Sequence, residues 1–378
     1  MIDALVVGAG IAGLEAAAEL QARGMEVDVV DEAPSSPAAG AGIILHPNAL
    51  AHLGDAREAV VRAGAEIAAQ RFNHAAGQAT EVAWEEVWGP GRRPTAIHRR
   101  VLARLLAERL PPRTIRWSTS VQHLEPGADG VTVRFADGQR ERYRIVLGAD
   151  GVRSTVRGFV DPDAQATYLG TMYWRLTVPW EAPFDVTDWL VWRRGPRFFG
   201  TMPVGGGRTH VFLQVHVDRV LDMPDEEKLP TMRAEAAHCG PPVDAMVAGI
   251  VPDQGLHVGP AFGIACRRWT AGRVALVGDS AHAFSPILSQ GGALAIEDAV
   301  VLAQELDRHG LEPAALAAYE RRRRPRVAHV IRMSRLHLML IDSGLAQPSG
   351  KDGDGWSARQ ASAVAWLRNL FEPLRTPA

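Results

Sequence analysis

The chain has 378 residues, enough for two subdomains, and its 47% hydrophobic and 22% charged residues are typical of a globular protein. A net charge of −2 excludes a strong general attraction to nucleic acid or acidic membranes, and no apolar run approaches the roughly 20 residues that span a bilayer. Its two cysteines, Cys239 and Cys266, form neither a disulfide framework nor a metal motif, so we expect no metal. Because a strand begins at the N-terminus, we expect no signal peptide and a cytoplasmic location.

The N-terminal segment has the pattern of a βαβ unit that binds a dinucleotide. Residues 4–7 predict a buried strand, residues 8–13 a glycine-rich turn, residues 14–22 a helix and residues 27–30 a second strand. Glycines let the backbone approach a pyrophosphate, and the helix N-terminus offers it free N–H groups. Asp31 can accept hydrogen bonds from the ribose hydroxyls. This motif alone does not distinguish FAD from NAD. The residues that we predict to bind the cofactor here are Gly8, Gly10, Ile11, Ala12, Gly13, Asp31 and Glu32.

Two further strands end in glycine and aspartate. Residues 144–147 lead into Gly148-Ala149-Asp150-Gly151, and residues 274–277 lead into Gly278-Asp279. A loop follows, and Gly291-Gly292 opens a helix to about residue 306, whose positive end would stabilise an anionic reduced flavin. Three such segments at the strand ends of one sheet predict one extended cofactor, a flavin dinucleotide.

With these segments the chain resembles, over nearly its whole length, the single-component FAD-dependent aromatic hydroxylases, the para-hydroxybenzoate hydroxylase-like family. The resemblance implies that the first segment binds the ADP half of FAD and that Asp150 lies along the pyrophosphate. It also implies that Asp279 binds the ribityl side and that Pro286 lies against the flavin. Further FAD contacts that it implies are Gly42, Ile43, Ile44, Arg99, Val121, Gly291, Gly292 and Ala293. The chain departs from the family at Ser289, where glycine is common.

We predict an α/β fold, with a Rossmann-like FAD-binding domain, a smaller antiparallel-sheet substrate domain and C-terminal helices. The FAD-binding domain would comprise residues 1–70, 98–165 and 263–345. Residues 71–97 and 166–262 would form the substrate domain, and residues 346–378 a linker and a C-terminal helix. We interpret residues 347–355 as the linker and expect the apolar stripe of residues 363–374 to pack on the FAD-binding domain.

Residues 167–217 alternate apolar and polar side chains with the period of strands. Met172, Trp174, Leu176 and Val178 form one apolar face, and the opposite face is mixed. We predict that the mixed face covers a cavity over the flavin, although it could instead face solvent. The predicted lining residues are Trp192, Phe199, Met202, His210, Phe212 and Gln214.

The arginines at 321–324 and 326 follow a predicted helix at residues 314–320. Given the near-neutral net charge, they favour a solvated helix face or contact with the cofactor domain over nucleic-acid binding.

The family resemblance implies an FAD-dependent monooxygenase that hydroxylates an aromatic, polycyclic or heteroaromatic small molecule with O₂ through a C4a-hydroperoxyflavin. No second glycine-rich fingerprint exists, so NADPH or NADH would dock transiently as cosubstrate. His46 and His210 are the candidate catalytic bases for a phenol proton, and the protein would be a monomer or homodimer. Alternatives are a flavin-dependent reductase or dehydrogenase on the same fold, or a non-catalytic FAD-binding protein.

Overall fold

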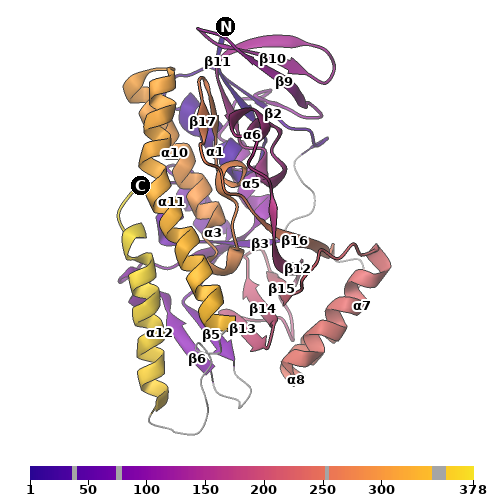
Figure 1. Ribbon diagram of the computed structural model, residues 1–378. Coiled ribbons are helices and arrows are strands. Elements are labelled where there is room, and N and C mark those ends of the chain that lie inside the picture. Colours follow the sequence, from indigo (N-terminus) through magenta and orange to yellow (C-terminus); the bar gives the residue numbers. More distant parts are fainter. Residues whose placement is uncertain (36–40, 74–78, 252–254, 343–354) are drawn as a thin grey trace.

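The computed structural model describes residues 1–35, 41–73, 79–251, 255–342 and 355–378. The predicted linker at 347–355 lies outside these ranges except for Gly355, which begins a helix. Two sheets dominate the molecule, one mainly parallel and one mainly antiparallel, and a long pair of helices runs beside them (Figure 1). Within the described ranges no helix is long and apolar enough to cross a membrane.

The larger sheet carries the predicted βαβ unit. Its strands are β1 (Ile2–Val7), β2 (Val27–Val30), β8 (Ile115–Arg116), β9 (Val121–Pro126), β10 (Val131–Phe135), β11 (Arg140–Gly148), β17 (Thr270–Ala271) and β18 (Val274–Leu276). Their order is β17-β18-β11-β1-β2-β8, and β10 and β9 extend from β11. The parallel register joins Val7 to Gly148 and Gly148 to Leu276. The three predicted glycine–aspartate segments therefore leave the sheet at the same edge, as expected.

The helices of this part of the molecule pack on the sheet, on one another and on the small sheet described below. They are α1 (Ile11–Gln21), α2 (Pro47–Leu50), α3 (Ala56–Ala63), α5 (Arg99–Ala107), α6 (Thr155–Val160), α9 (Asp279–His282), α10 (Gly291–His309) and α11 (Pro313–Asp342). Alanine side chains on α1 are fully buried, which lets α10 pack closely against it. The helix predicted at 314–320 is the first part of α11, which continues through Pro325 and packs along α10.

The second sheet forms the other end of the molecule in Figure 1. Its strands are β5 (Ala69–Asn73), β6 (Ala79–Ala83), β12 (Thr167–Pro179), β13 (Trp189–Arg194), β14 (Arg197–Pro203), β15 (Arg208–His216) and β16 (His257–Gly263), in the order β16-β12-β15-β14-β13-β5-β6. Met172, Trp174 and Leu176 pack in a core with α7 (Asp225–Ala236) and α8 (Pro241–Ala248). The opposite face is also buried, so the alternative in which it faces solvent is wrong.

A small sheet and the C-terminal segment complete the fold. The sheet has the order β3 (Gly42–Leu45), β7 (Thr95–His98), β4 (Ala65–Glu66). Helix α12 (Gly355–Phe371) lies against α4 (Trp84–Trp88) and β6. Beyond it, Arg326 on α11 donates to the carbonyls of Pro373 and Leu374. The C-terminal segment thus contacts both parts of the molecule and not the FAD-binding part alone.

Candidate active site

The glycine turn between β1 and α1 is too tight for a side chain at two positions. Gly8 has a φ of 106°, and a Cβ there would lie 2.5 Å from the carbonyl oxygen of Ala149. A Cβ on Gly13 would lie 1.9 Å from the carbonyl oxygen of Gly8. At Gly10, by contrast, no heavy atom of the described residues lies within 4 Å of that position. The N-terminus of α1 therefore faces open space, where an anion would meet its free N–H groups.

Asp31, at the end of β2, binds the glycine turn itself. Its carboxylate accepts hydrogen bonds from the N–H groups of Ala9 at 2.7 Å and of Ala33 at 2.9 Å. Oδ2 thus fixes the glycine turn and Oδ1 the loop after β2, roles that the sequence did not predict. The neighbouring Glu32 is exposed at the same edge.

Two more carboxylates stand at the ends of β11 and β18. Asp150 accepts hydrogen bonds from the N–H groups of Thr155 and Val156, and its Oδ1 is buried without a partner among the described residues. Burial raises the pKa of Asp150. Asp279 is exposed, and its Oδ1 lies 4.0 Å from the Cβ position of Gly291. Asp279 and the N-terminus of α10 therefore meet at one point of the sheet edge.

The strand β3 connects this edge to the antiparallel sheet. Gly42 packs so closely on β15 that a Cβ would lie 2.6 Å from that of His210. The N–H of Arg99 donates to the carbonyl of Ala41, and its side chain is exposed at the start of α5. Val121 begins β9 and is buried. Gly42 and Arg99 therefore lie together, between the two sheets.

The loop before α10 closes on β3. Pro286 begins a 3₁₀ turn, η3 (Pro286–Leu288), and Ser289 follows in the left-handed region with a φ of 53°. Glycine adopts that conformation without strain, which explains why it is common at this position in the family. A Cβ on Gly292 would lie 2.6 Å from Ile43 Cδ1, and Ala293 is fully buried. The predicted segments 42–44 and 291–293 are therefore in contact.

The face of the antiparallel sheet opposite α7 and α8 presents the mixed side chains. Cross-strand register pairs Tyr173 with Gln214 and Arg175 with Phe212. The hydroxyl of Tyr173 donates to Gln214 Oε1 at 3.1 Å. The face carries Tyr173, Arg175, Phe198, Met202, His210, Phe212 and Gln214. Gly42 packs on His210 of this face, and the neighbouring Ile43 packs on Gly292, so β3 lies between the mixed face and the start of α10.

Two predicted lining residues are on the wrong face. Trp192 pairs with Phe199 across β13 and β14, and both lie in the core beneath α7 and α8. Phe198, which pairs with Gln214, is the residue of β14 that shares the mixed face. Tyr173 and Arg175 were not predicted as lining residues, although the alternation along β12 already places them on that face.

His210 is buried on the mixed face and hydrogen-bonded at one nitrogen. Its Nδ1 lies 2.9 Å from the carbonyl oxygen of Leu176. A carbonyl only accepts, so Nδ1 carries the proton and the lone pair of the neutral ring is on Nε2. Burial lowers its pKa to about 4, so the ring is neutral near pH 7. The ring is stacked on Phe212.

His46 has the surroundings of a core residue. Its ring lies 5.0 Å from that of Trp84, 5.7 Å from Trp88 and 5.2 Å from Phe371, measured between ring centroids. Burial lowers its pKa to about 3. The side chain is 1% exposed and packs under the C-terminal segment, unlike His210 on the mixed face.

A buried network of charges supports the Gly278–Asp279 turn from behind. Asp298 accepts hydrogen bonds from the N–H of Gly278 at 3.0 Å and from His282 Nε2 at 2.6 Å. Arg323 on α11 pairs with Asp298 at 2.7 Å and with Glu297 at 2.8 Å. Burial opposes ionisation, but Arg323 helps to hold the pKa of both carboxyls below its usual range. Of the two interpretations of the arginine run, contact with the cofactor domain is correct for Arg323.

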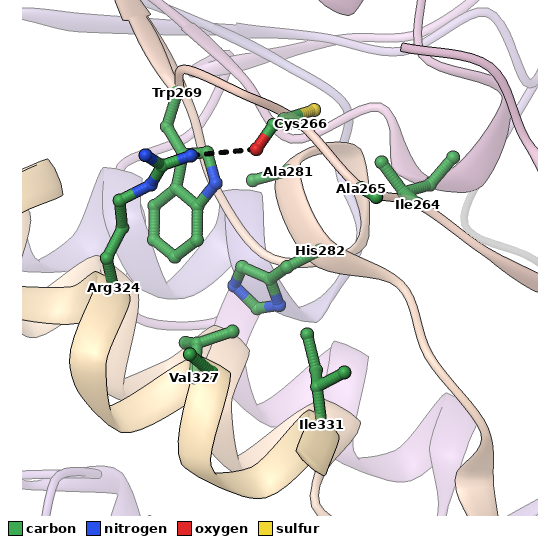
Figure 2. Close-up of a pocket in the computed structure, with 10 residues that line it drawn as sticks. Ile264, Ala265, Cys266, Trp269, Ala281, His282, Arg324, Val327 and Ile331 are labelled. Carbon is green, nitrogen blue, oxygen red and sulfur yellow. Dashed lines mark hydrogen bonds between the residues drawn. The ribbon is translucent and has the colours of Figure 1, made fainter. Parts of the chain in front are cut away.

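Figure 2 shows a separate groove on the outer side of α9. Trp269 and His282 form part of its wall, with ring centroids 5.0 Å apart, and Val327 and Ile331 of α11 lie beside them. Arg324 donates to the carbonyl oxygen of Cys266. The groove is lined mainly by apolar side chains and lies behind the loops described above. The described residues contain no cluster of three or more His, Cys, Asp or Glu side chains suited to a metal ion.

The residues at the sheet edge fit an extended dinucleotide. Open space at Gly10 and the free N-terminus of α1 suit a pyrophosphate, and the exposed Glu32 suits a ribose. Asp279 and the N-terminus of α10 stand further along the same edge. Together they provide polar contacts along a line, as a flavin dinucleotide requires.

Comparison with known proteins gives the same result. The family model described as "FAD binding domain" matches residues 1–334. The chain is 36% identical over 380 residues to the 3-amino-4-hydroxybenzoate 2-monooxygenase PtnB3 of Streptomyces platensis, covering 96% of this chain and 94% of that protein. It is 31% identical over 347 residues to the FAD-dependent urate hydroxylase of Klebsiella pneumoniae, covering 88% of this chain and 89% of that protein.

A solved structure extends the likeness to the fold. The crystal structure of Klebsiella pneumoniae HpxO complexed with FAD and uric acid matches with a TM-score of 0.83 and 26% identity, covering 99% of this chain and 95% of that one. The predicted fold class and the predicted FAD cofactor are thereby confirmed. The chain belongs to the FAD-binding monooxygenase family, whose members related to it are aromatic hydroxylases.

Proposed function

We propose that this FAD-dependent monooxygenase hydroxylates one small aromatic or heteroaromatic ring that binds between the loop at 285–293 and the mixed face of the antiparallel sheet. The packing of β3 carries this placement, because β3 touches both the sheet and the loop. A Cβ on Gly42 would lie 2.6 Å from that of His210, and a Cβ on Gly292 would lie 2.6 Å from Ile43 Cδ1. Electrons would come from NADH or NADPH, which binds transiently. FAD, when bound, supplies the redox chemistry, and the protein positions the ring and excludes water.

The cofactor residues take the roles that their positions support. Gly8 and Gly10, with the N-terminus of α1, receive the pyrophosphate, and Glu32 receives the ribose next to it, while Gly13 lets α1 pack against β1. Asp279 and the N-terminus of α10 receive the other half of the cofactor, with Gly42 and Arg99 opposite. The division of the chain into an FAD-binding and a substrate domain follows the two sheets and is part of this proposal.

His210 is the better of the two candidate bases. Its Nδ1 is held by the Leu176 carbonyl, so the lone pair of Nε2 can accept a hydrogen bond from a ring hydroxyl. His46 is enclosed by aromatic rings beneath the C-terminal segment, and we assign it to packing.

The names of the relatives support a planar, electron-rich substrate. They include a 3-amino-4-hydroxybenzoate 2-monooxygenase and a urate hydroxylase, and both names refer to a ring that bears oxygen or nitrogen. A phenol or a heteroaromatic ring with such substituents is the class that we propose for this chain. A cytoplasmic location and a monomeric or homodimeric state belong to the same proposal.

Oxygen isotope transfer tests the proposed activity. The purified FAD-loaded protein is supplied with NADH or NADPH, a panel of phenols and heteroaromatic compounds, and ¹⁸O₂. We expect substrate-dependent reductant oxidation and a product that contains one ¹⁸O atom. Turnover without oxygen would instead indicate a dehydrogenase, and bound FAD without turnover on any ring would indicate a binding protein.

The position of FAD has its own test. Asp279→Ala removes the exposed carboxylate beside α10, and we expect the variant to lose FAD and the yellow colour. Asp137→Ala, in the turn after β10, is the matched control and should keep both. Stoichiometric flavin in Asp279→Ala would count against the placement.

A further inference from the structure

Arg175 lies on the mixed face and has no acidic partner within the part of the chain that the structure describes. It is partly buried on β12, and its Nε is shielded from solvent without a hydrogen-bond partner among the described residues. Its guanidinium carbon lies 5.3 Å from the centroid of the Tyr173 ring. That cation–π contact holds the side chain on the face but does not use its N–H donors.

Two buried arginines outside this face are held by acceptors of the protein itself. Arg323 pairs with Glu297 and Asp298, and Arg157 donates to four backbone carbonyls. On the substrate sheet, Arg208 is exposed and donates to the carbonyl and hydroxyl of Thr177. Arg175 therefore differs from these three arginines, because no acceptor among the described residues takes its donors.

The charges nearest to Arg175 make this arrangement costly. Burial, and then the positive charge of Arg99, lower the pKa of Arg175, and Arg175 in turn lowers the pKa of His210 and His257. No carboxylate of the described residues forms an ion pair with it. Burial of a cation without a counter-charge lowers the stability of the fold, and no ion pair among the described residues compensates for it here.

A planar anion would supply what is missing. The guanidinium fork matches the two oxygens of a carboxylate, and hydrogen bonds to charged groups are stronger when solvent is excluded. Phe212 pairs with Arg175 across the strands, and Met202 and Phe198 extend the apolar surface on the same face. The face therefore combines one cation with a surface suited to a ring.

We propose that Arg175 binds the carboxylate of the substrate and that this monooxygenase therefore selects aromatic acids over their neutral analogues. This deepens the proposed function and rests on it. Tyr173 is a positioning residue in this arrangement. Its ring holds the guanidinium, and its hydroxyl donates to Gln214 on β15, which fixes that anchor on the sheet.

The test compares matched pairs of ligands on the FAD-loaded protein. The probes are 4-hydroxybenzoate, salicylate, anthranilate and 3-amino-4-hydroxybenzoate, each with its carboxamide, and binding is followed by the change in flavin absorbance. We expect at least one acid to bind about 10- to 100-fold more tightly than its amide, the range of a charge-assisted hydrogen bond. Arg175→Gln should reduce that preference to about onefold, and Arg175→Lys should keep part of it. Arg208→Gln, the exposed control, should leave it unchanged.

Several results would overturn the assignment. One is an absence of preference for every acid in the parent protein, and another is an undiminished preference in Arg175→Gln. A third is loss of FAD from both Arg175 variants with normal folding, which would assign Arg175 to the cofactor. Failure of the broader proposal looks different, because then no ring, acidic or neutral, would receive ¹⁸O. An enzyme that transfers ¹⁸O equally to neutral rings and to acids would keep the proposed function and lose only the role of Arg175.

Discussion

At the scale of single residues, the glycine turn shows two different reasons for a glycine: close packing within the protein, and space for the cofactor. Gly13 is required by the protein, since a side chain there would collide with the backbone of Gly8. Gly10 has room for a side chain in the protein alone. Its lack of a side chain is therefore explained by the cofactor and not by the fold.

Alanine substitution at these two positions should give opposite results. Gly10→Ala should fold, with a loss of about 1 kcal/mol at the N-cap, and should bind FAD about tenfold or more weakly. Gly13→Ala should fail to fold or lose several °C in Tm, because backbone would have to move. Thermal unfolding and FAD titration of both variants check this. Equal FAD affinity in Gly10→Ala and the parent would contradict it.

Residue patterns also show how far the sequence could predict the site. The glycine–aspartate segments were predictable because each follows a buried strand, and the resemblance supplied Arg99 and Gly42 without their contacts. The sheet face on which Phe199 lies was not predictable, because either of the adjacent phenylalanines, Phe198 or Phe199, could lie on the mixed face. Only the pairing of Phe198 with Gln214 across the strands decides it. The role of Asp31 was missed because nothing in the sequence shows that its carboxylate turns back to Ala9.

At the scale of elements, the pair α10–α11 supports the cofactor edge through buried charges. The sequence did not predict the length of α11, since an internal proline usually ends a helix, although contact of its arginines with the cofactor domain was one of the two interpretations. Here Arg323 and Arg326 bind Glu297 on α10, on either side of Pro325. Tertiary ion pairs thus keep the helix continuous where local sequence favours a break.

Removing one member of this network should be costly. Arg323→Met leaves the buried carboxylates of Glu297 and Asp298 without their partner, and we expect a loss of about 3–5 kcal/mol in the free energy of unfolding. Arg321→Met, on the exposed side of the same helix, should change it by less than about 0.5 kcal/mol. Urea unfolding of both variants measures the difference. Similar stability of the two would show that the network does not support the fold.

At the scale of the whole molecule, burial of neutral histidine couples stability to pH. His46 has an ordinary pKa of 6.5, and burial lowers it to about 3 in the folded chain. Between these values the unfolded chain binds a proton that the folded chain does not. The stabilisation is therefore complete above pH 6.5 and is lost as the pH falls toward 3.

His46→Phe removes this titrating group while keeping an aromatic ring among Trp84, Trp88 and Phe371. Compared with the parent, the variant should lose about 1.4 kcal/mol less stability for each pH unit between about 6 and 4. Urea unfolding at several pH values gives both slopes. Parallel slopes would mean that His46 is protonated in the folded protein, contrary to its enclosed position.

The central claim is that the flavin and the substrate bind between the edge of the larger sheet and the mixed face of the antiparallel sheet. A crystal structure of the FAD-loaded protein tests it most directly. We expect the pyrophosphate at Gly10 and the N-terminus of α1, and the flavin ring between the loop at 285–293 and the face that carries Tyr173 and Arg175. A flavin bound anywhere else, such as the groove beside Trp269 and His282, would contradict this account of the active site.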